Sequence, residues 1–202
     1  MAARREADEA PEAFRRALDS LRSANPRREI VLAETPAPAR LAPYAVAMTA
    51  DVVSAEHELA TGRLVLLHDP AGHEAWQGTF RVVTYVRADV EAEMALDPLL
   101  GDVGWAWLTE ALHAHEAGFT AASGTVTRVS SQSLGGLAGE PSSAQIEIRA
   151  SWTPAAPPAA TPMDRHLLAW CDLLCTTAGL PPVPAGVVEL PTPAARRSAR
   201  RR

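Results

Sequence analysis

Apolar residues recur at helical spacing in three parts of the chain. In residues 9–22 they lie three to four positions apart with charged residues between them, which predicts an amphipathic helix ending before Pro26. A second helix is expected to begin at Asp97, whose carboxylate can accept from free amide groups of the first turn, and to end at Gly118. A third begins at Met163 and has an apolar side.

Between these helices the pattern changes to that of strands. β-type runs at 29–33, 45–54, 63–68 and 79–90 are separated by turn-forming residues, and Thr61-Gly62 is interpreted as a turn. Two further strands are predicted within 119–136 and 142–152, with Gly124 as a bend or bulge in the first. In the second, apolar and polar residues alternate regularly, which predicts one covered face and one wetter face.

These elements predict an α+β fold. Short loops between successive strands favour antiparallel pairing. We therefore expect a mainly antiparallel sheet of five to six strands with two or three helices packed on one face. The pattern leaves the order of the strands open.

The chain length of 202 residues fits one domain with loose ends. We expect a disordered N-terminus at 1–8, a single α+β domain at 9–180 and a disordered tail rich in Pro and Arg at 181–202. Within the domain, the proline-rich segment 153–162 is predicted to be an extended linker.

The net charge and the apolar content of the chain limit which binding partners and which cellular compartment we expect. The formal net charge is −5, although the last seven residues, "RRSARRR", contain five arginines, so the rest of the chain is more acidic still. An acidic body disfavours nucleic acid and anionic lipid, except for weak phosphate contact by the arginine-rich tail. The N-terminus lacks the apolar stretch of a signal peptide, and no apolar run could span a bilayer, so we expect a cytoplasmic protein without a membrane partner.

The densest polar cluster is "HDPAGHEAW", residues 68–76. His68, Asp69, His73 and Glu74 supply nitrogen and oxygen atoms within one turn, but their spacing matches no metal signature, and hairpin loops are polar in any case. We therefore predict no metal site. The same region could instead form a ligand-binding pocket from the residues His68, Asp69, Trp76 and Arg81.

Five arginines lie on predicted strands: Arg63, Arg81, Arg87, Arg128 and Arg149. Those on the wetter face could grip a carboxylate or phosphate. Alternatively, they pair across strands with Glu147 and other acids. Every Lys or Arg position of the chain is occupied by arginine, which we interpret as coding bias. The presence of arginine alone is therefore weak evidence for a functional site.

Other chemistry-bearing residues are interpreted mainly as structural. Most of "DVGWAWLTEALHAHEAG" is predicted to be core, and His115 and Trp105 are left as either core or pocket wall. His113 projects away from His115, so the two cannot share a metal. Cys171 and Cys175 are expected to be small buried hydrophobic side chains.

No dinucleotide, Walker, nucleophile-elbow or zinc-protease motif occurs, so no catalytic residue and no cofactor is predicted. That absence leaves open whether the protein is an enzyme.

The segment "ATGRLVLLHDPAGHEAWQGTFRVVTYVRADVEAEMALDPLLGDVGWAWLTEAL" resembles a bacterial family catalogued as domain of unknown function three thousand. The resemblance extends to "RLAPYA", "SGTVTRVSSQSLGG", "AQIEIRASWTP" and "HLLAWCDLLCTTAGLPP". It implies a single-domain cytoplasmic protein and assigns no activity, cofactor or catalytic residue.

Two functional hypotheses follow. The first is a non-enzymatic binding or regulatory module whose partner is a protein or a small molecule. The second is an enzyme or small-molecule sensor with the pocket near His68, Asp69, Trp76 and Arg81. A homodimer is compatible with either hypothesis.

Overall fold

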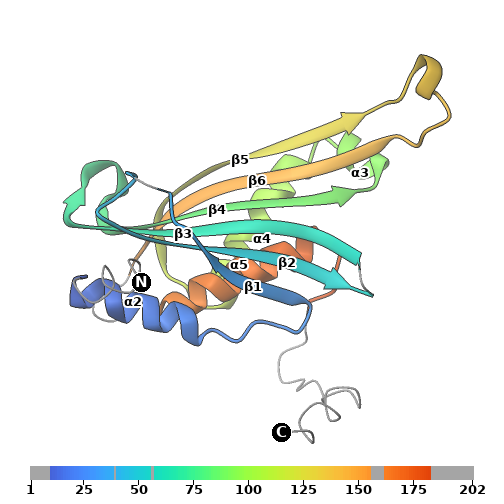
Figure 1. Ribbon diagram of the computed structural model, residues 1–202. Helices are drawn as coiled ribbons and strands as arrows, with labels where there is room; N and C mark the ends of the chain where they lie inside the picture. Colours follow the sequence, from blue (N-terminus) through green and yellow to red (C-terminus); the bar gives the residue numbers. More distant parts are fainter. Residues whose placement is uncertain (1–9, 39, 56, 156–161, 183–202) are drawn as a thin grey trace, which may run out of the picture.

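Six strands form one antiparallel sheet in the order β1-β2-β3-β4-β6-β5 (Figure 1). The computed structural model describes residues 10–38, 40–55, 57–155 and 162–182. The predicted α+β class is confirmed, and the sheet has six strands. Their bounds are β1 (Ile30–Thr35), β2 (Tyr44–Ser54), β3 (His57–His73), β4 (Gly78–Val90), β5 (Phe119–Ser131) and β6 (Ser143–Pro154).

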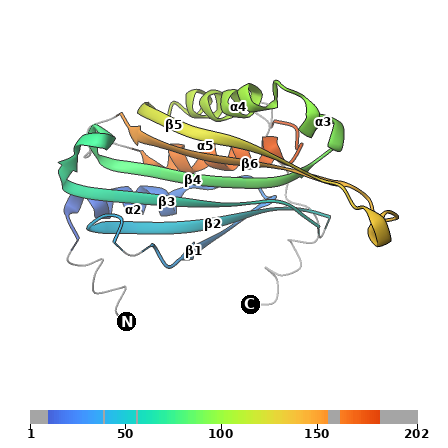
Figure 2. The ribbon, with the colours of Figure 1, turned by 90° about the horizontal axis from the view of Figure 1, so that it is seen from above.

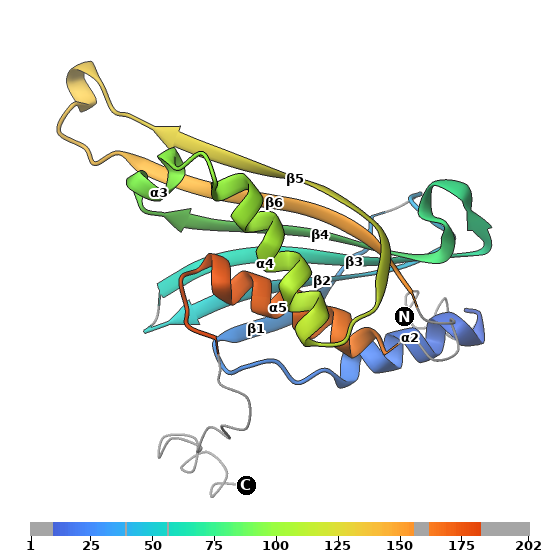
Figure 3. The same ribbon diagram turned by 180° about the vertical axis from the view of Figure 1, so that it is seen from behind.

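The long helices lie together on one side of this sheet, as Figures 2 and 3 show. They are α2 (Glu12–Ser23), α4 (Leu100–Ala114) and α5 (Met163–Thr177), with a short helix α3 (Ala92–Leu96) before α4. The core therefore lies between the helices and one sheet face. We call this the covered face and the opposite one the open face.

The chain does not follow the strand order throughout. Strands β1 to β4 are neighbours in sequence and in space, after which α3 and α4 carry the chain to the far edge, where β5 lies. Strand β6 then returns between β5 and β4. The β5–β6 hairpin, whose connection contains the short 3₁₀ helix η2 (Gly135–Leu137), extends beyond the rest of the sheet (Figures 1 and 2).

The predicted turn at Thr61-Gly62 is wrong, because both residues lie within β3. Gly62 is instead a contact point between sheet and helix: a Cβ atom there would lie 2.8 Å from Trp170 and 2.9 Å from Leu174 of α5. Gly124 on β5 has the same role for Trp105 of α4, which would lie 2.8 Å from such a Cβ. A glycine inside a strand here marks close helix packing rather than chain reversal.

The predicted bulge falls near Gly124 but not on it. The register of β5 against β6 shifts between Thr120 and Ser123, and Ala121 has a φ of 49°. One extra residue on β5 at this point is a β-bulge, which turns a backbone carbonyl out of the ladder.

The limits of α4 differ from the prediction at both ends. The side chain of Asp97 accepts from the amide of Leu99 at 2.8 Å, but the helix begins only at Leu100. At the other end the left-handed residue is Glu116, with a φ of 50°, and not Gly118. The predicted caps are therefore wrong at both ends: the N-cap is Leu99 without a side-chain cap, and both predicted boundaries lie a few residues too far out.

The linker predicted over 153–162 begins too early. Thr153 and Pro154 belong to β6, where they pair with Thr120 and Phe119. A proline is tolerated there because it ends the strand. Residues 156–161 lie outside the described part of the chain, as do the predicted N-terminal tail at 1–8 and residues 183–202 of the C-terminal tail.

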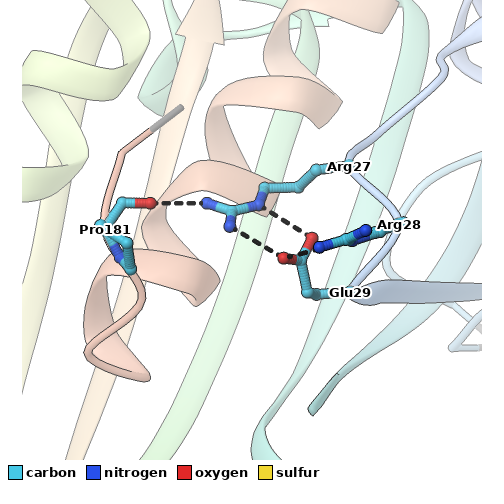
Figure 4. A network of polar contacts seen from close by, with 4 residues as sticks. All are labelled: Arg27, Arg28, Glu29 and Pro181. Carbon is cyan, nitrogen blue, oxygen red and sulfur yellow. Dashed lines mark hydrogen bonds and ion pairs between the residues drawn. The ribbon is translucent and has the colours of Figure 1, made fainter. Parts of the chain in front are cut away.

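The start of β1 is tied to the end of α5 by a small polar network (Figure 4). Arg27 donates to Glu29 from two nitrogens, at 3.2 and 3.1 Å, and to the carbonyl of Pro181 at 3.0 Å. Both ionised side chains are largely buried, and the hydrogen bonds from Arg27 hold the pKa of Glu29 below its ordinary value. The network therefore fixes the C-terminal end of α5 against the sheet.

Candidate functional site

The open face of the sheet carries a shallow groove over β3, β4, β6 and β5. Its volume is about 760 Å³, within the range of small-molecule sites. We call it the open-face groove and define it by the residues that line it: Arg63, Val65, Val83, Thr84, Tyr85, Ser123, Gly124, Thr125, Arg149, Ala150 and Ser151.

Strand register arranges the groove in rows, because directly paired residues point to the same side of a sheet. One row consists of Arg63, Tyr85, Arg149 and Thr125, and the next of Val65, Val83, Ser151 and Ser123. Successive rows are about 7 Å apart along the strands. The two valines thus form an apolar floor beside a row that contains two cations.

The open face is partly covered at the β3 edge of the groove. Ala47, Val65 and Leu67 form a second apolar cluster, against which Ala37, Ala42 and Trp76 pack, so Val65 is only 6% exposed. The three clustered residues belong to β2 and β3. Over β4 and β6 the floor stays accessible, and Val83 is 37% exposed.

The two arginines in the lining have different environments. Arg149 forms an ion pair with Glu147 at 2.9 Å and lies 5.0 Å from the centre of the Tyr85 ring. Arg63 donates to the carbonyl of Pro36 at 2.7 Å, and its Nε is buried without a hydrogen-bond partner in the described part of the chain. No aspartate or glutamate lines the groove. The groove is therefore cationic on an otherwise acidic protein.

Glu147 also accepts a hydrogen bond from the hydroxyl of Tyr85 at 3.0 Å. Burial, with a smaller contribution from this bond, raises the pKa of Tyr85. Tyr85 is thus a neutral aromatic wall at neutral pH, and Glu147 offsets the charge of Arg149 rather than that of Arg63. The alternative expected from sequence is pairing across strands; Arg149 does pair with Glu147, but along the same strand, β6.

Arg81 lies behind one end of the groove and is only 7% exposed. Its Nη1 donates to the carbonyl of Ala121 at 2.8 Å and to Oγ1 of Thr153 at 3.1 Å. Its Nη2 donates to Oγ of Ser151 at 2.7 Å, to the Ser151 carbonyl at 3.2 Å and to Oγ of Ser123 at 3.3 Å. The carbonyl turned out by the β5 bulge is thereby satisfied, so Arg81 holds the bulge in place.

The four residues predicted to form a pocket are divided by the sheet. His68 is on the covered face, 3% exposed, with its ring 4.1 Å from that of Phe80 and its Nδ1 2.9 Å from the carbonyl of Thr79. Burial lowers its pKa. Arg81 is on the open face, because its strand neighbour Phe80 faces the helices.

Asp69 lies in the irregular last part of β3, where the register against β4 is interrupted, and Trp76 follows the strand. Trp76 lies in the 3₁₀ helix η1 (Glu74–Trp76), packs against the second apolar cluster and stacks on His73. Asp69 accepts from the amide of Ala71 at 3.0 Å, as is typical of a turn. The structure thus brings Arg81 near Trp76 through Thr153, which donates to the Trp76 carbonyl, and separates both from His68. Ligand binding by these four residues stays a prediction.

The other candidate clusters take structural positions. In the described residues, no group of three or more His, Cys, Asp or Glu side chains is placed to hold a metal ion. His115 Nε2 lies 2.7 Å from Asp172 Oδ2 and so connects α4 to α5. Trp105 packs against the core, while His113 is exposed beside Phe119.

Both cysteines are buried and free. Burial raises the pKa of both thiols, that of Cys175 to about 11. They are therefore protonated packing residues.

Sequence reasoning missed Val83, Tyr85, Ser123 and Ser151. A signal for two of them was present: "TFRVVTYVRADV" places Arg81, Val83, Tyr85 and Arg87 on one face, and that face is not uniformly polar. The two serines could not be identified from the sequence, because their position depends on β6, and not β5, lying beside β4.

The fold and the groove define an α+β protein with one antiparallel sheet, one helix-covered face and one cationic open face. The chain belongs to the family described as Protein of unknown function (DUF3000), whose model matches residues 10–188. No curated protein and no solved structure matches it. Within the described part of the chain, no helix has both the length and the apolar character needed to cross a membrane.

Proposed function

We propose that this protein is a non-enzymatic binding or regulatory module that holds a small amphipathic molecule in the open-face groove. The observation that carries the proposal is the groove itself: about 760 Å³ over an apolar floor of Val65 and Val83, with arginine, tyrosine and serine side chains converging on it. Such a combination of an apolar surface and a few placed polar groups is typical of ligand sites.

The groove also favours a small-molecule ligand rather than a protein partner with a large binding surface. Arg63 is held by Pro36, and Arg149 by Glu147 and Tyr85, so the walls are positioned before any ligand arrives. Preorganised polar groups reduce the entropy lost on binding. A cytoplasmic location and a homodimer remain predictions from the sequence.

An enzyme at His68, Asp69, Trp76 and Arg81 is the less favoured alternative. In the described residues, no serine or cysteine side chain is hydrogen-bonded to a histidine, as a nucleophile paired with a base would be. His68 is on the other side of the sheet from the groove.

The test is native mass spectrometry of the full-length protein purified gently from its own host. We expect a mass excess that disappears on unfolding. Val83→Trp, which fills the centre of the floor, should abolish the excess, whereas Thr127→Trp, on the open face but outside the groove, should retain it. A bare wild-type protein, or an excess that survives Val83→Trp, would overturn the proposal.

A further inference from the structure

Two serines at one end of the groove are linked to the buried Arg81. Ser123 on β5 and Ser151 on β6 are directly paired, and their hydroxyl oxygens lie 3.5 Å apart. We call them the serine pair. Both hydroxyls accept from Nη2 of Arg81, and both line the groove.

The direction of these bonds determines what the serine pair can do. A guanidinium group can only donate, so each serine oxygen must accept from Arg81. One hydroxyl hydrogen forms the long 3.5 Å bond to the other hydroxyl, and the second hydrogen is left to donate elsewhere. A bound anion would replace that long bond, so the serine pair can offer it two O–H donors with a positive charge behind them.

The charge of Arg81 has no counterpart in the described structure. All five of its hydrogen-bond acceptors are neutral oxygens, and no carboxylate in the described residues forms an ion pair with it. A buried, unpaired cation is costly to a folded protein. An anion next to the serine pair would offset that cost through the polarised hydroxyls.

Arg63, in the row next to that of the serine pair, is a second cation. It too has no carboxylate partner among the described residues. The floor between the two is made by Val65 and Val83, which share a row with the serine pair. An occupant matched to this surface has a negative group at the serine pair and an apolar part that extends over the valines toward β3.

We propose that the serine pair, backed by Arg81, binds the carboxylate of an amphipathic organic acid whose apolar part lies on Val65 and Val83. This inference rests on the proposed function and specifies its ligand class. Two neighbouring hydroxyl donors match the two oxygens of a carboxylate. A phosphate would direct further oxygens at the valine floor, where they would lack partners.

The experiment compares octanoate with its neutral isostere octanamide and with octyl phosphate. Binding to the full-length protein is measured by titration calorimetry and located by amide chemical shifts of β3, β4, β5 and β6. We expect octanoate to bind in the groove at least about tenfold more tightly than octanamide, because hydrogen bonds to an ionised group are stronger than neutral ones.

Ser123→Ala combined with Ser151→Ala removes both donors and retains Arg81. This variant should weaken octanoate binding about tenfold or more and weaken octanamide binding by a smaller factor, because the amide loses only neutral hydrogen bonds. The control is Thr127→Ala, which deletes a hydroxyl from the open face of the same strand, outside the groove and without touching Arg81. It should leave octanoate binding unchanged.

The outcomes separate this inference from the proposed function. Equal binding of octanoate and octanamide in the groove would overturn the carboxylate site and leave the groove a ligand site. Tighter binding of octyl phosphate than of octanoate would overturn the choice of carboxylate. Absence of groove shifts with all three probes would overturn the inference, while the mass-excess measurement on host-purified protein decides the proposed function separately.

Discussion

The two faces of the sheet are built from alternate residues of the same strands and follow different rules. On β4, Phe80, Val82 and Val86 point to the helices and are almost completely buried. Their neighbours Arg81 and Val83 point to the open face, where one is a hydrogen-bonded cation and the other is exposed. The covered face buries its side chains against the helices, whereas the open face combines accessible apolar area with charge.

The two faces should differ most in how much the free energy of unfolding falls when an aromatic side chain is removed. Trp152 on the covered face is fully buried, so Trp152→Ala should lower the free energy of unfolding by about 4 kcal/mol. Tyr85→Ala on the open face should lower it by less than about 2 kcal/mol, because part of that ring already contacts solvent. Urea unfolding measures both, and equal losses would show that the open face is packed like the core.

The second difference concerns pH. His166 on α5 accepts a hydrogen bond from Trp152 Nε1 at 3.1 Å, and burial lowers its pKa to about 4, partly opposed by Asp164. Below its ordinary value of 6.5 the unfolded chain takes up a proton that the folded protein does not accept until about pH 4. Stability from this residue should thus be complete above pH 6.5 and fall by about 3 kcal/mol as pH drops to 4.

His166→Asn retains an acceptor for Trp152 and does not titrate, so its unfolding free energy should depend less on pH in that window. Parallel pH profiles for the variant and the wild-type protein would contradict the assignment. Arg81 on the open face, although burial lowers its pKa, stays charged in the same window.

A third comparison lies within the open face itself. Arg81→Lys keeps the charge but loses the planar arrangement that joins Ala121, Thr153 and the serine pair, so we expect a loss of about 2 kcal/mol. Hydrogen exchange at residues 120–123 should also become faster. Arg149→Lys, on an exposed side chain, should change stability by less than about 0.5 kcal/mol. Similar effects of the two substitutions would mean that Arg81 does not hold the bulge.

The smallest effect uses two adjacent residues. Val82 is 1% exposed and Val83 is 37% exposed. Val82→Ala should cost about 1.5 kcal/mol and Val83→Ala less than about 0.5 kcal/mol in thermal or urea unfolding. Reversal of that order would place the core on the wrong side of β4.

Sequence patterning predicted the fold class well because alternation and helical spacing report directly on burial. It failed where tertiary packing decides the local structure. Gly62 looks like a turn residue from its neighbours alone, and only the approach of Trp170 explains it. Likewise, the polar sequence around His68 is typical of a binding site in a loop, but the His68 ring is enclosed by Phe14, Tyr44 and Phe80.

The groove was harder to predict than the fold. Arg81 is part of the pocket predicted from sequence, and the strand arginines are predicted as one possible anion-binding patch. Which groups surround them depends on β6 lying between β4 and β5, and on the bulge that directs the Ala121 carbonyl to Arg81. Neither follows from local periodicity.

The position of β6 between β4 and β5 affects how the sheet is completed during folding. The first four strands are linked by short connections, whereas the β5–β6 hairpin joins them along a single seam between β4 and β6, after a long intervening stretch with two helices. Because that stretch must be closed before the hairpin pairs, we expect docking of the hairpin to be the slow, nonlocal step of folding. The open-face groove straddles this seam, since Val65 and Val83 come from one side and the serine pair from the other. A molecule bound there would hold the two halves of the sheet together and protect the finished protein from opening along β4 and β6.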